Sequence, residues 1–303
     1  MRLTTRAAAG MMLSAIISCT TDGGGVTPDI PQPEPPVSVK REMRISTSVD
    51  PVTRVTDTQF ETGDCIGLYV VNRTGDCTLR NSGNHVDNMR FAFSGTWTPD
   101  TPVYWLDDNT HADLYVYYPY RKDIGDVRAV EVDVPADQST PEAYKAGEVL
   151  TGAATDVAPT ETAVAVTMRH AMSRMMIDVT PGNGFTAGQL ADAAVKVTVN
   201  GLKTAAVLDI ARGAVTAVGD AKTITPLLSD GTYQALVVPQ AVEECNLITV
   251  NIDGTDYHLK KAFVFDAGKS HWFSVAVSRT SGGINVNIDG WETDGTDNGG
   301  VAE

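Results

Sequence analysis

The chain has 303 residues, 23 of them basic and 38 acidic, so its formal net charge is −15. Binding to a phosphate backbone needs clustered Lys and Arg, and the absence of such a cluster argues against a nucleic-acid partner. Apolar residues make up 42% of the chain, which is enough for folded cores and excludes wholesale disorder. The longest apolar run is too short for a membrane-spanning helix, which argues against a polytopic membrane protein.

Residues 1–18 have the layout of a secretory signal peptide. Two arginines, Arg2 and Arg6, precede the apolar residues 7–17, and Ser18 precedes Cys19. A branched apolar residue, a free position, a small residue and a cysteine form the bacterial lipobox, in which the cysteine is acylated and the chain is cut before it. We therefore predict lipidation of Cys19, which would give a stable membrane anchor. The alternative is an ordinary signal peptide with an incidental cysteine.

Residues 19–37 are predicted to be a flexible tether. They contain three consecutive glycines and then five prolines, without apolar periodicity. Glycine-rich chain is flexible and proline-rich chain is extended, so this stretch would hold a folded body away from a membrane.

The rest of the chain favours short β-strands, because apolar and polar residues alternate with period two. Strands are predicted at residues 44–49, 65–71, 113–118, 130–134, 195–199, 233–238, 247–252, 257–265, 272–277 and 284–288. Asp253-Gly254 predicts a hairpin, Asn200-Gly201 predicts a turn, and residues 186–194 give a weak helical pattern. Many short strands with regular turns are typical of sandwiches rather than of parallel α/β sheets.

The alternation changes phase between residues 164 and 180. Val164, Val166 and Met168 share one phase, whereas Ile177 and Val179 have the opposite one. One strand cannot keep the same face buried through such a change without a bulge or a break. We therefore predict two tandem sandwich domains, at residues 38–165 and 166–290, followed by an acidic tail, residues 291–303, that frays.

No catalytic or metal-binding motif is present, so we predict no enzyme activity, no catalytic residue, no metal and no cofactor. The five histidines are scattered, and His170 is best interpreted as a packed core or boundary residue. Cys65 and Cys77 would lie too far apart in a hairpin for a disulfide, and with Cys245 they are expected to be free thiols. Five aromatic residues could line a sugar platform, although cross-strand core pairs are favoured: Trp105, Tyr115, Tyr117, Tyr118 and Tyr120.

Several motifs, in order behind the lipobox, resemble the fimbrillin family of pilus-subunit lipoproteins (type V pili) from Bacteroidales, Gram-negative anaerobes of the gut and mouth. The matching stretches are Thr53-Arg54-Val55-Thr56 with residues 60–69, Trp105 with residues 115–119, residues 166–174, Val237-Val238-Pro239-Gln240, and residues 265–275 with Trp291. The resemblance implies an all-β fold of two tandem transthyretin-like antiparallel β-sandwiches, and no enzyme activity.

The resemblance also implies a function: a structural or adhesive subunit of a surface pilus (fimbria), carried to the outer membrane as a lipoprotein. An Arg-specific protease would remove the first strand, and a strand of the next subunit would replace it. The exchanged strand would carry Ile45, Thr47 and Val49 on one face, and Arg54 is the candidate processing site. Arg41 and Arg44 precede or begin this strand, so a cut there would not release it.

The candidate donor strand carries Ile284, Val286 and Ile288. Expected partners are other pilus subunits, the outer membrane through the lipid, and a host or bacterial surface ligand. Shaft, anchor and tip roles stay open, because an anchor would keep the lipid on Cys19 and a shaft subunit would lose it. The alternative function is a surface glycan-binding lipoprotein of a nutrient-uptake system.

Overall fold

The computed structural model describes residues 40–50, 59–279 and 300–302 of the chain. Seventeen strands and two six-residue helices form this described part, which confirms the all-β class. None of its helices is long and apolar enough to cross a membrane.

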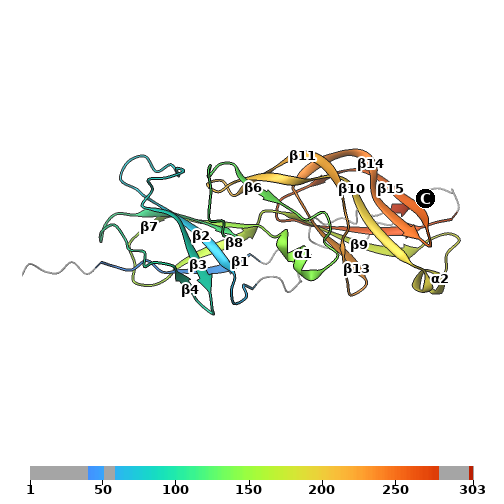
Figure 1. Cartoon of the computed structure of the whole chain (residues 1–303), viewed down its shortest axis with the longest axis horizontal. Coiled ribbons are helices and arrows are strands. Elements are labelled where there is room, and N and C mark those ends of the chain that lie inside the picture. The colour runs from blue at the N-terminus through green and yellow to red at the C-terminus, as the bar shows by residue number, and fades with distance from the viewer. Residues whose placement is uncertain (1–39, 51–58, 280–299, 303) are drawn as a thin grey trace, which may run out of the picture. The chain divides into compact units, whose positions relative to one another are not determined.

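The first sheet has seven strands, in the order β1-β8-β7-β5-β2-β3-β4 along the sheet. Six of them are labelled in Figure 1, all except β5. The members of the sheet are β1 (Ile45–Val49), β2 (Cys65–Asn72), β3 (Val86–Phe93), β4 (Trp97–Pro99), β5 (Ala112–Tyr118), β7 (Leu150–Val157) and β8 (Val164–His170). Strands β1 and β4 therefore lie at its two ends. Most pairs are antiparallel, but β1 runs parallel to β8.

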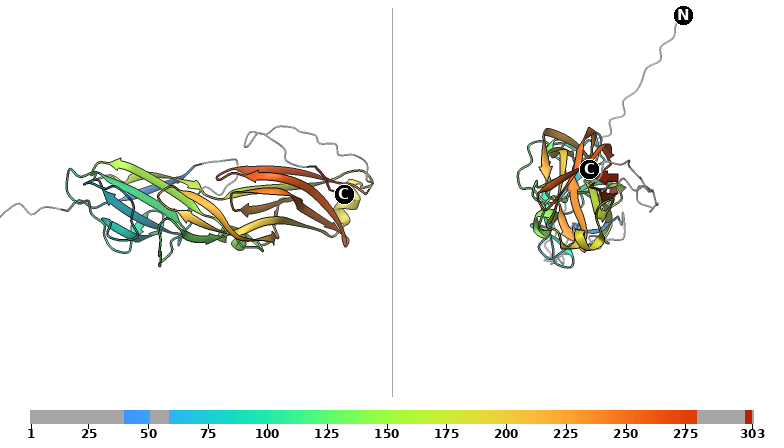
Figure 2. Two further views of the ribbon diagram at one scale, coloured as in Figure 1. Left: turned by 90° about the horizontal axis from the view of Figure 1, so that it is seen from above. Right: turned by 90° about the vertical axis from the view of Figure 1, so that its right-hand side faces the viewer.

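Two further sheets of five strands each contain the remaining strands (Figure 2). One sheet has the order β11-β10-β14-β15. Its strands are β10 (Val195–Asp209), β11 (Ala214–Ile224), β14 (Gln240–Ile252) and β15 (Thr255–Phe265). Its fifth strand, β6 (Val130–Asp133), pairs with the second half of β10. The other has the order β12-β13-β9-β16-β17 and comprises β9 (Ser173–Pro181), β12 (Leu227–Ser229), β13 (Thr232–Val237), β16 (Ser270–Val277) and β17 (Gly300–Ala302). Buried residues of both sheets belong to one core, so the pair forms a sandwich.

Two buried cores meet at the central strands of the first sheet. In β2, Leu68 and Val70 belong to the core of the first sheet, whereas Tyr69 and Val71 belong to the core shared with the other two sheets. Because both faces of β2 are buried, its sequence is a nearly continuous apolar run instead of an alternating one.

Several local predictions are confirmed. Asp253 and Gly254 have φ values of 50° and 87° and join β14 to β15, as expected for a two-residue hairpin turn. The weak helical pattern is α2 (Ala187–Asp192), whose start is fixed by a capping box between Thr186 and Gln189. The other helix, α1 (Pro141–Ala146), has Thr140 as its N-cap.

Three expectations need correction. Asn200-Gly201 forms no chain reversal: it lies inside β10, where Gly201 has a φ of 76° and the pairing with β11 shifts register. Three residues near the chain end form β17 along β16, so the tail is not frayed throughout. The sheets are not purely antiparallel, since β1–β8, β9–β16 and β16–β17 are parallel pairs.

The change of alternation phase coincides with a break between sheets, as predicted. Strand β8 ends at His170 in the first sheet, and β9 begins at Ser173 in the third sheet. The intervening Ala171 and Met172 are each 2% exposed. The predicted domain limit at residues 165 and 166 falls within β8, and β6 pairs with a strand from beyond that limit. The limits 38–165 and 166–290 stay a prediction.

We expect Gly67→Ala to destabilise the protein, because a Cβ there would collide with the ring of Tyr117. That ring is 1% exposed, and its hydroxyl donates to Asn88 Oδ1 at 2.7 Å, so it has little room to move. The expected loss in the free energy of unfolding, measured with urea, is about 1–3 kcal/mol. Gly125→Ala is the control, since nothing lies within 4 Å of its added Cβ. Equal stability of the two variants would contradict this close approach.

Candidate functional site

Strand β1 is the candidate exchanged strand, and the structure places it at one end of the first sheet. It pairs with β8 alone, in parallel, over five residues from Ile45 opposite Val164 to Val49 opposite Met168. Ile45 and Val49 are buried, Thr47 is half-buried, and the serines between them are exposed. The predicted strand and its inner face are thus confirmed.

The residues just before β1 form backbone hydrogen bonds with the segment around residues 103–105. The Met43 amide donates to the Val103 carbonyl at 2.7 Å, and the Trp105 amide donates to the Arg41 carbonyl at 2.9 Å. The Met43 side chain is 1% exposed and belongs to the same core as Ile45. Residues 41–49 therefore complete the core of the first sheet as one continuous segment.

A side-chain hydrogen bond joins β1 to the opposite end of the sheet. Trp97 Nε1, from β4, donates to Thr47 Oγ1 at 2.8 Å. Because β1 and β4 are the two end strands, the sheet must curl until these ends meet. The centre of the Trp97 ring lies 5.0 Å from that of Phe60 and 5.0 Å from that of Phe93, so Trp97 belongs to a cluster of half-buried aromatic rings.

The residues that flank residues 51–58 on either side make contacts with the rest of the fold. Before them, the Asp50 amide donates to the Met168 carbonyl at 2.9 Å. After them, Phe60 packs edge-on against Tyr118, and Lys145 Nζ lies 2.6 Å from a Glu61 carboxylate oxygen. The hydrogen bond to Glu61 raises the pKa of Lys145, and burial raises the pKa of Tyr118 well above its ordinary value. Arg54 belongs to residues 51–58 and lies outside the described residues.

The other two arginines near β1 have partners within the fold. Arg41 Nη1 donates to the Pro159 carbonyl at 3.0 Å, and Arg41 Nη2 lies 3.1 Å from Asp108. Arg44 forms an ion pair with Glu42 at 3.0 Å. Cleavage after either residue would leave β1 attached to the rest of the chain.

The remaining predicted site residues fall outside the described residues: Cys19, Ile284, Val286 and Ile288. One of the elements that sequence reasoning missed is β17, which pairs along β16 from Val275 to Val277. Three residues that include a glycine are too few to give an alternation pattern.

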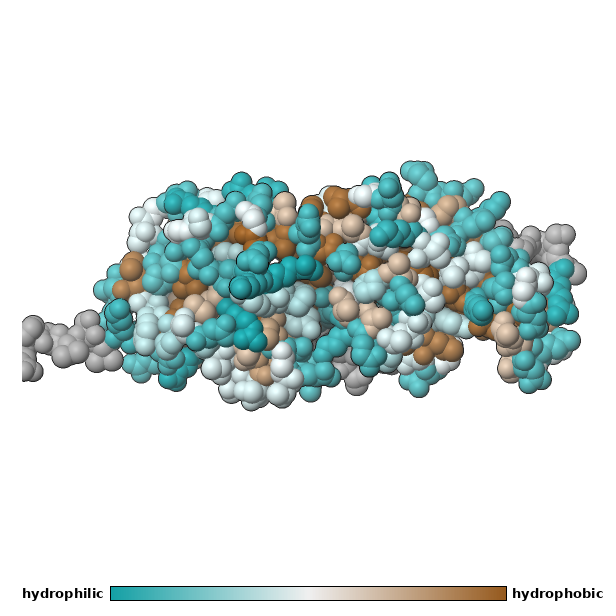
Figure 3. Space-filling model, viewed as in Figure 1, coloured by the Kyte–Doolittle hydropathy of each residue, from teal (hydrophilic) through white to brown (hydrophobic). Residues whose placement is uncertain are grey.

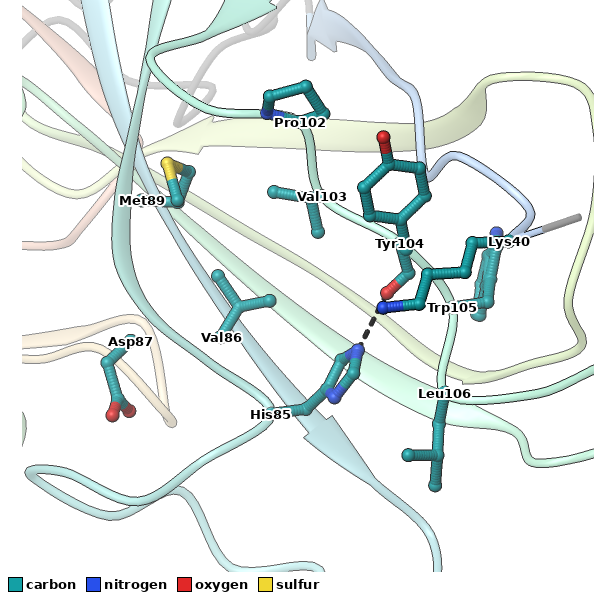
Figure 4. A pocket seen from close by; sticks show the side chains of 10 residues that line it. All are labelled: Lys40, His85, Val86, Asp87, Met89, Pro102, Val103, Tyr104, Trp105 and Leu106. Atoms are coloured by element: carbon teal, nitrogen blue, oxygen red, sulfur yellow. Dashed lines mark hydrogen bonds between the residues drawn. The ribbon is translucent and has the colours of Figure 1, made fainter.

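A shallow pocket of 430 Å³ lies beside the segment that precedes β1 (Figure 4). Lys40, His85, Tyr104 and Leu106 contribute to its lining, and His85 Nε2 donates to the Tyr104 carbonyl at 2.7 Å. Trp105 also borders it but is buried. Its Nε1 alone, among the buried side-chain polar atoms of the described residues, lacks a hydrogen-bond partner. Tyr104 is thus the single exposed aromatic residue of this pocket.

The five aromatic residues considered for a sugar platform lie mainly in the cores. Trp105, Tyr117 and Tyr118 are buried, and Tyr115 and Tyr120 are half-buried. This confirms the favoured interpretation as core residues.

The polar candidates make local contacts. His170 is half-buried with its Nδ1 2.8 Å from Glu148, as expected for a boundary residue. Cys65, Cys77 and Cys245 are free thiols, and Arg90 donates to Cys65 Sγ at 3.0 Å. Within the part of the chain that the structure describes, no three potential metal ligands come together.

Polar residues cover most of the face seen in Figure 3, with apolar residues scattered between them. Two of the large apolar side chains that are more than a third exposed, Tyr104 and Leu106, share one loop, and the others come from four different strands: Val218, Leu228, Val264 and Trp272. The described surface therefore offers few apolar contacts compared with the interior that β1 covers.

The known proteins that this chain resembles are named for fimbriae and for cell adhesion. The chain is 27% identical over 257 residues to Fim1C of Bacteroides uniformis, named as a proposed fimbrium subunit, covering 79% of this chain and 81% of the relative. A crystal structure of a proposed cell adhesion protein from B. uniformis superposes with a TM-score of 0.62 at 19% identity, covering 86% of this chain and 97% of that one. A second, from B. ovatus, gives 0.63 at 16% identity, with coverage of 78% and 92%.

None of these three names describes an enzyme. The structural likenesses establish the fold, and the family follows from the sequence. A sequence model described as fimbrillin-like matches residues 53–291, which is most of the chain. The chain therefore belongs to the fimbrillin-like family.

Proposed function

We propose that the chain is a structural or adhesive subunit of a surface pilus, exported as a lipoprotein and assembled by protease-triggered strand exchange. The observation that carries the proposal is the place of β1: an end strand, paired with one neighbour, whose inner face completes a core. Family membership and the fimbrial names of the relatives support the pilus itself.

A cut within residues 51–58 would turn the N-terminal segment into a separate strand, held only by non-covalent contacts. Its departure would uncover the sites of Met43, Ile45 and Val49, each now less than a tenth exposed. Exposing one such site costs about 1.5–3 kcal/mol, so an empty groove would be strongly unfavourable. A strand of similar pattern from another subunit would fill it by β-strand addition, and a head-to-tail contact of this kind continues into a filament.

Processing would also decide where a subunit lies in the pilus. A subunit cut after Arg54 loses Cys19 and its lipid, as a shaft subunit must. An uncut subunit keeps the lipid and stays at the outer membrane, as an anchor must. The partners are other pilus subunits, the membrane and a surface ligand. The alternative glycan-uptake role has less support, because the described pocket exposes one aromatic residue and the relatives are named for fimbriae and adhesion.

We expect Arg54 to be the first site that an Arg-specific protease cuts in a brief digestion of residues 20–303. Intact mass should show a single early cut after Arg54, and size-exclusion chromatography should then show oligomers when a subunit with a matching strand is present. Arg54→Ala should stay uncut and monomeric, whereas Arg44→Ala should behave like the unchanged protein. An unchanged protein that resists cutting and stays monomeric would remove the polymerisation proposal.

Ile45→Ala should weaken the packing of β1 on the sheet, because truncation of this buried side chain would leave a cavity in the core of the first sheet. The expected loss in the free energy of unfolding is about 2–5 kcal/mol, measured by urea denaturation. Ser46→Ala, one residue further and exposed, is the matched control and should change stability by less than about 0.5 kcal/mol. Similar effects of both changes would show that burial of the inner face of β1 does not stabilise this strand on the sheet.

Cys19→Ala should abolish the anchor without changing the fold. In cells fed labelled palmitate, the unchanged protein should carry label and fractionate with outer membranes. The variant should be unlabelled and leave the membrane fraction, because no acyl chain is attached to hold it. Persistence of the label in the variant would rule out Cys19 as the lipidation site.

A further inference from the structure

We infer that the groove under β1 selects its strand through a hydrogen bond from Trp97, and so takes a strand of another subunit that carries Ser or Thr between two apolar residues. This inference rests on the proposed strand exchange and adds to it the identity of the partner strand. It also predicts that the candidate donor strand of this same chain is a poor occupant.

The selecting contact lies in the middle of the inner face of β1. Ile45 and Val49 point into the core on either side of Thr47, and Thr47 Oγ1 accepts from Trp97 Nε1 at 2.8 Å. An indole N–H can only donate, so it requires an acceptor on the strand that faces it. The pattern that β1 presents is therefore apolar, hydroxyl, apolar at every second residue.

The surroundings of Trp97 make an apolar replacement costly. Its ring is part of an aromatic group with Phe60 and Phe93, and it packs against the core of the first sheet. Trp97 is half-buried and its hydrogen bond to Thr47 is partly buried, so a strand with valine opposite Trp97 would hinder the access of water to the N–H without giving it an acceptor. Leaving a partly buried donor without an acceptor costs free energy, which lets such a site discriminate between strands.

The same contact fixes the register of the incoming strand. A slip by one residue turns the apolar side chains out of the groove. A slip by two residues keeps the correct face inward but places an apolar residue opposite Trp97. Only one register satisfies both the apolar sites and the indole.

The candidate donor strand of this chain lacks the required group. Its apolar face carries Ile284, Val286 and Ile288, so Val286 would lie opposite Trp97 in either strand direction. A shift by two residues brings Ile284 or Ile288 to that place, and neither has an acceptor. The groove and this strand are thus mismatched, which favours assembly with a different subunit over self-polymerisation.

The test uses the full body, residues 20–303, with the recognition sequence of a site-specific protease inserted within residues 51–58. After cleavage, labelled peptides of residues 41–50 replace the nicked strand, and fluorescence anisotropy gives their dissociation constants. The Thr47→Ser peptide should bind within a few-fold of the unchanged one. The Thr47→Val peptide, which has almost the same shape, should bind about tenfold more weakly or worse.

A second pair of peptides tests the mismatch directly. The peptide of residues 281–290 should bind weakly, and its Val286→Thr variant should bind about tenfold more tightly. In a Trp97→Phe protein the preference should disappear in both pairs, because the donor is gone. A purely structural role of Trp97 would instead weaken all peptides by the same factor. Should Trp97→Phe fail to fold, the two pairs on the unchanged protein still decide the matter.

The outcomes separate the two levels of the proposal. If the unchanged peptide binds but the valine peptide binds equally well, selection by Trp97 is wrong while strand exchange stands. If the unchanged peptide does not bind either, strand exchange itself is contradicted, and the selection with it.

Discussion

The fold depends on the burial of one short segment at the edge of a curled sheet. Residues 41–49 supply Met43, Ile45 and Val49 to a core that the other six strands leave open. Their backbone contacts reach only β8 and the chain around residues 103–105. The segment thus contributes three buried apolar side chains to this core and is held by few backbone hydrogen bonds. This is the combination that makes a strand both necessary for the fold and replaceable by another of the same pattern.

That open edge is tolerable because the rest of the sheet is firmly held from its other face. Strands β2 and β5 bury side chains on both faces, and Tyr69 and Tyr117 join the core shared with the two five-stranded sheets. Strand β6 extends from the first half of the chain to pair with β10. A groove left by β1 would therefore have walls supported from behind, which would help the remaining sheet keep its shape while a replacement strand fills the groove.

Much of this architecture can be predicted from local sequence patterns, but some strands cannot. The strands at Ile45–Val49 and Leu247–Ile252 alternate clearly, and Asp253-Gly254 has the backbone freedom that a tight hairpin requires. Strand β3 was missed because polar residues interrupt it and Asn88 has a φ of 46°, which disturbs the alternation. Strand β11 was missed because it is largely exposed, so no apolar face marks it.

The site shows the same division between local and distant information. The inner face of β1 could be predicted from five residues. Its parallel partner, more than a hundred residues away, could not, and neither could the meeting of Thr47 with Trp97, which depends on the curl of the whole sheet. Processing at Arg54, lipidation of Cys19 and the donor strand at Ile284–Ile288 are sequence predictions that lie outside the described residues.

The parallel pairing of β1 with β8 also has a mechanical consequence. The chain enters β1 at the same end at which it enters β8, and it leaves β8 towards β9, in the sandwich of the two five-stranded sheets. Tension between the start of β1 and the rest of the body would therefore pull the two strands past each other along their length. All of their hydrogen bonds would bear the load together, instead of opening one after another from an end. A replacement strand that kept this direction would give each joint of a filament the same resistance to being drawn apart.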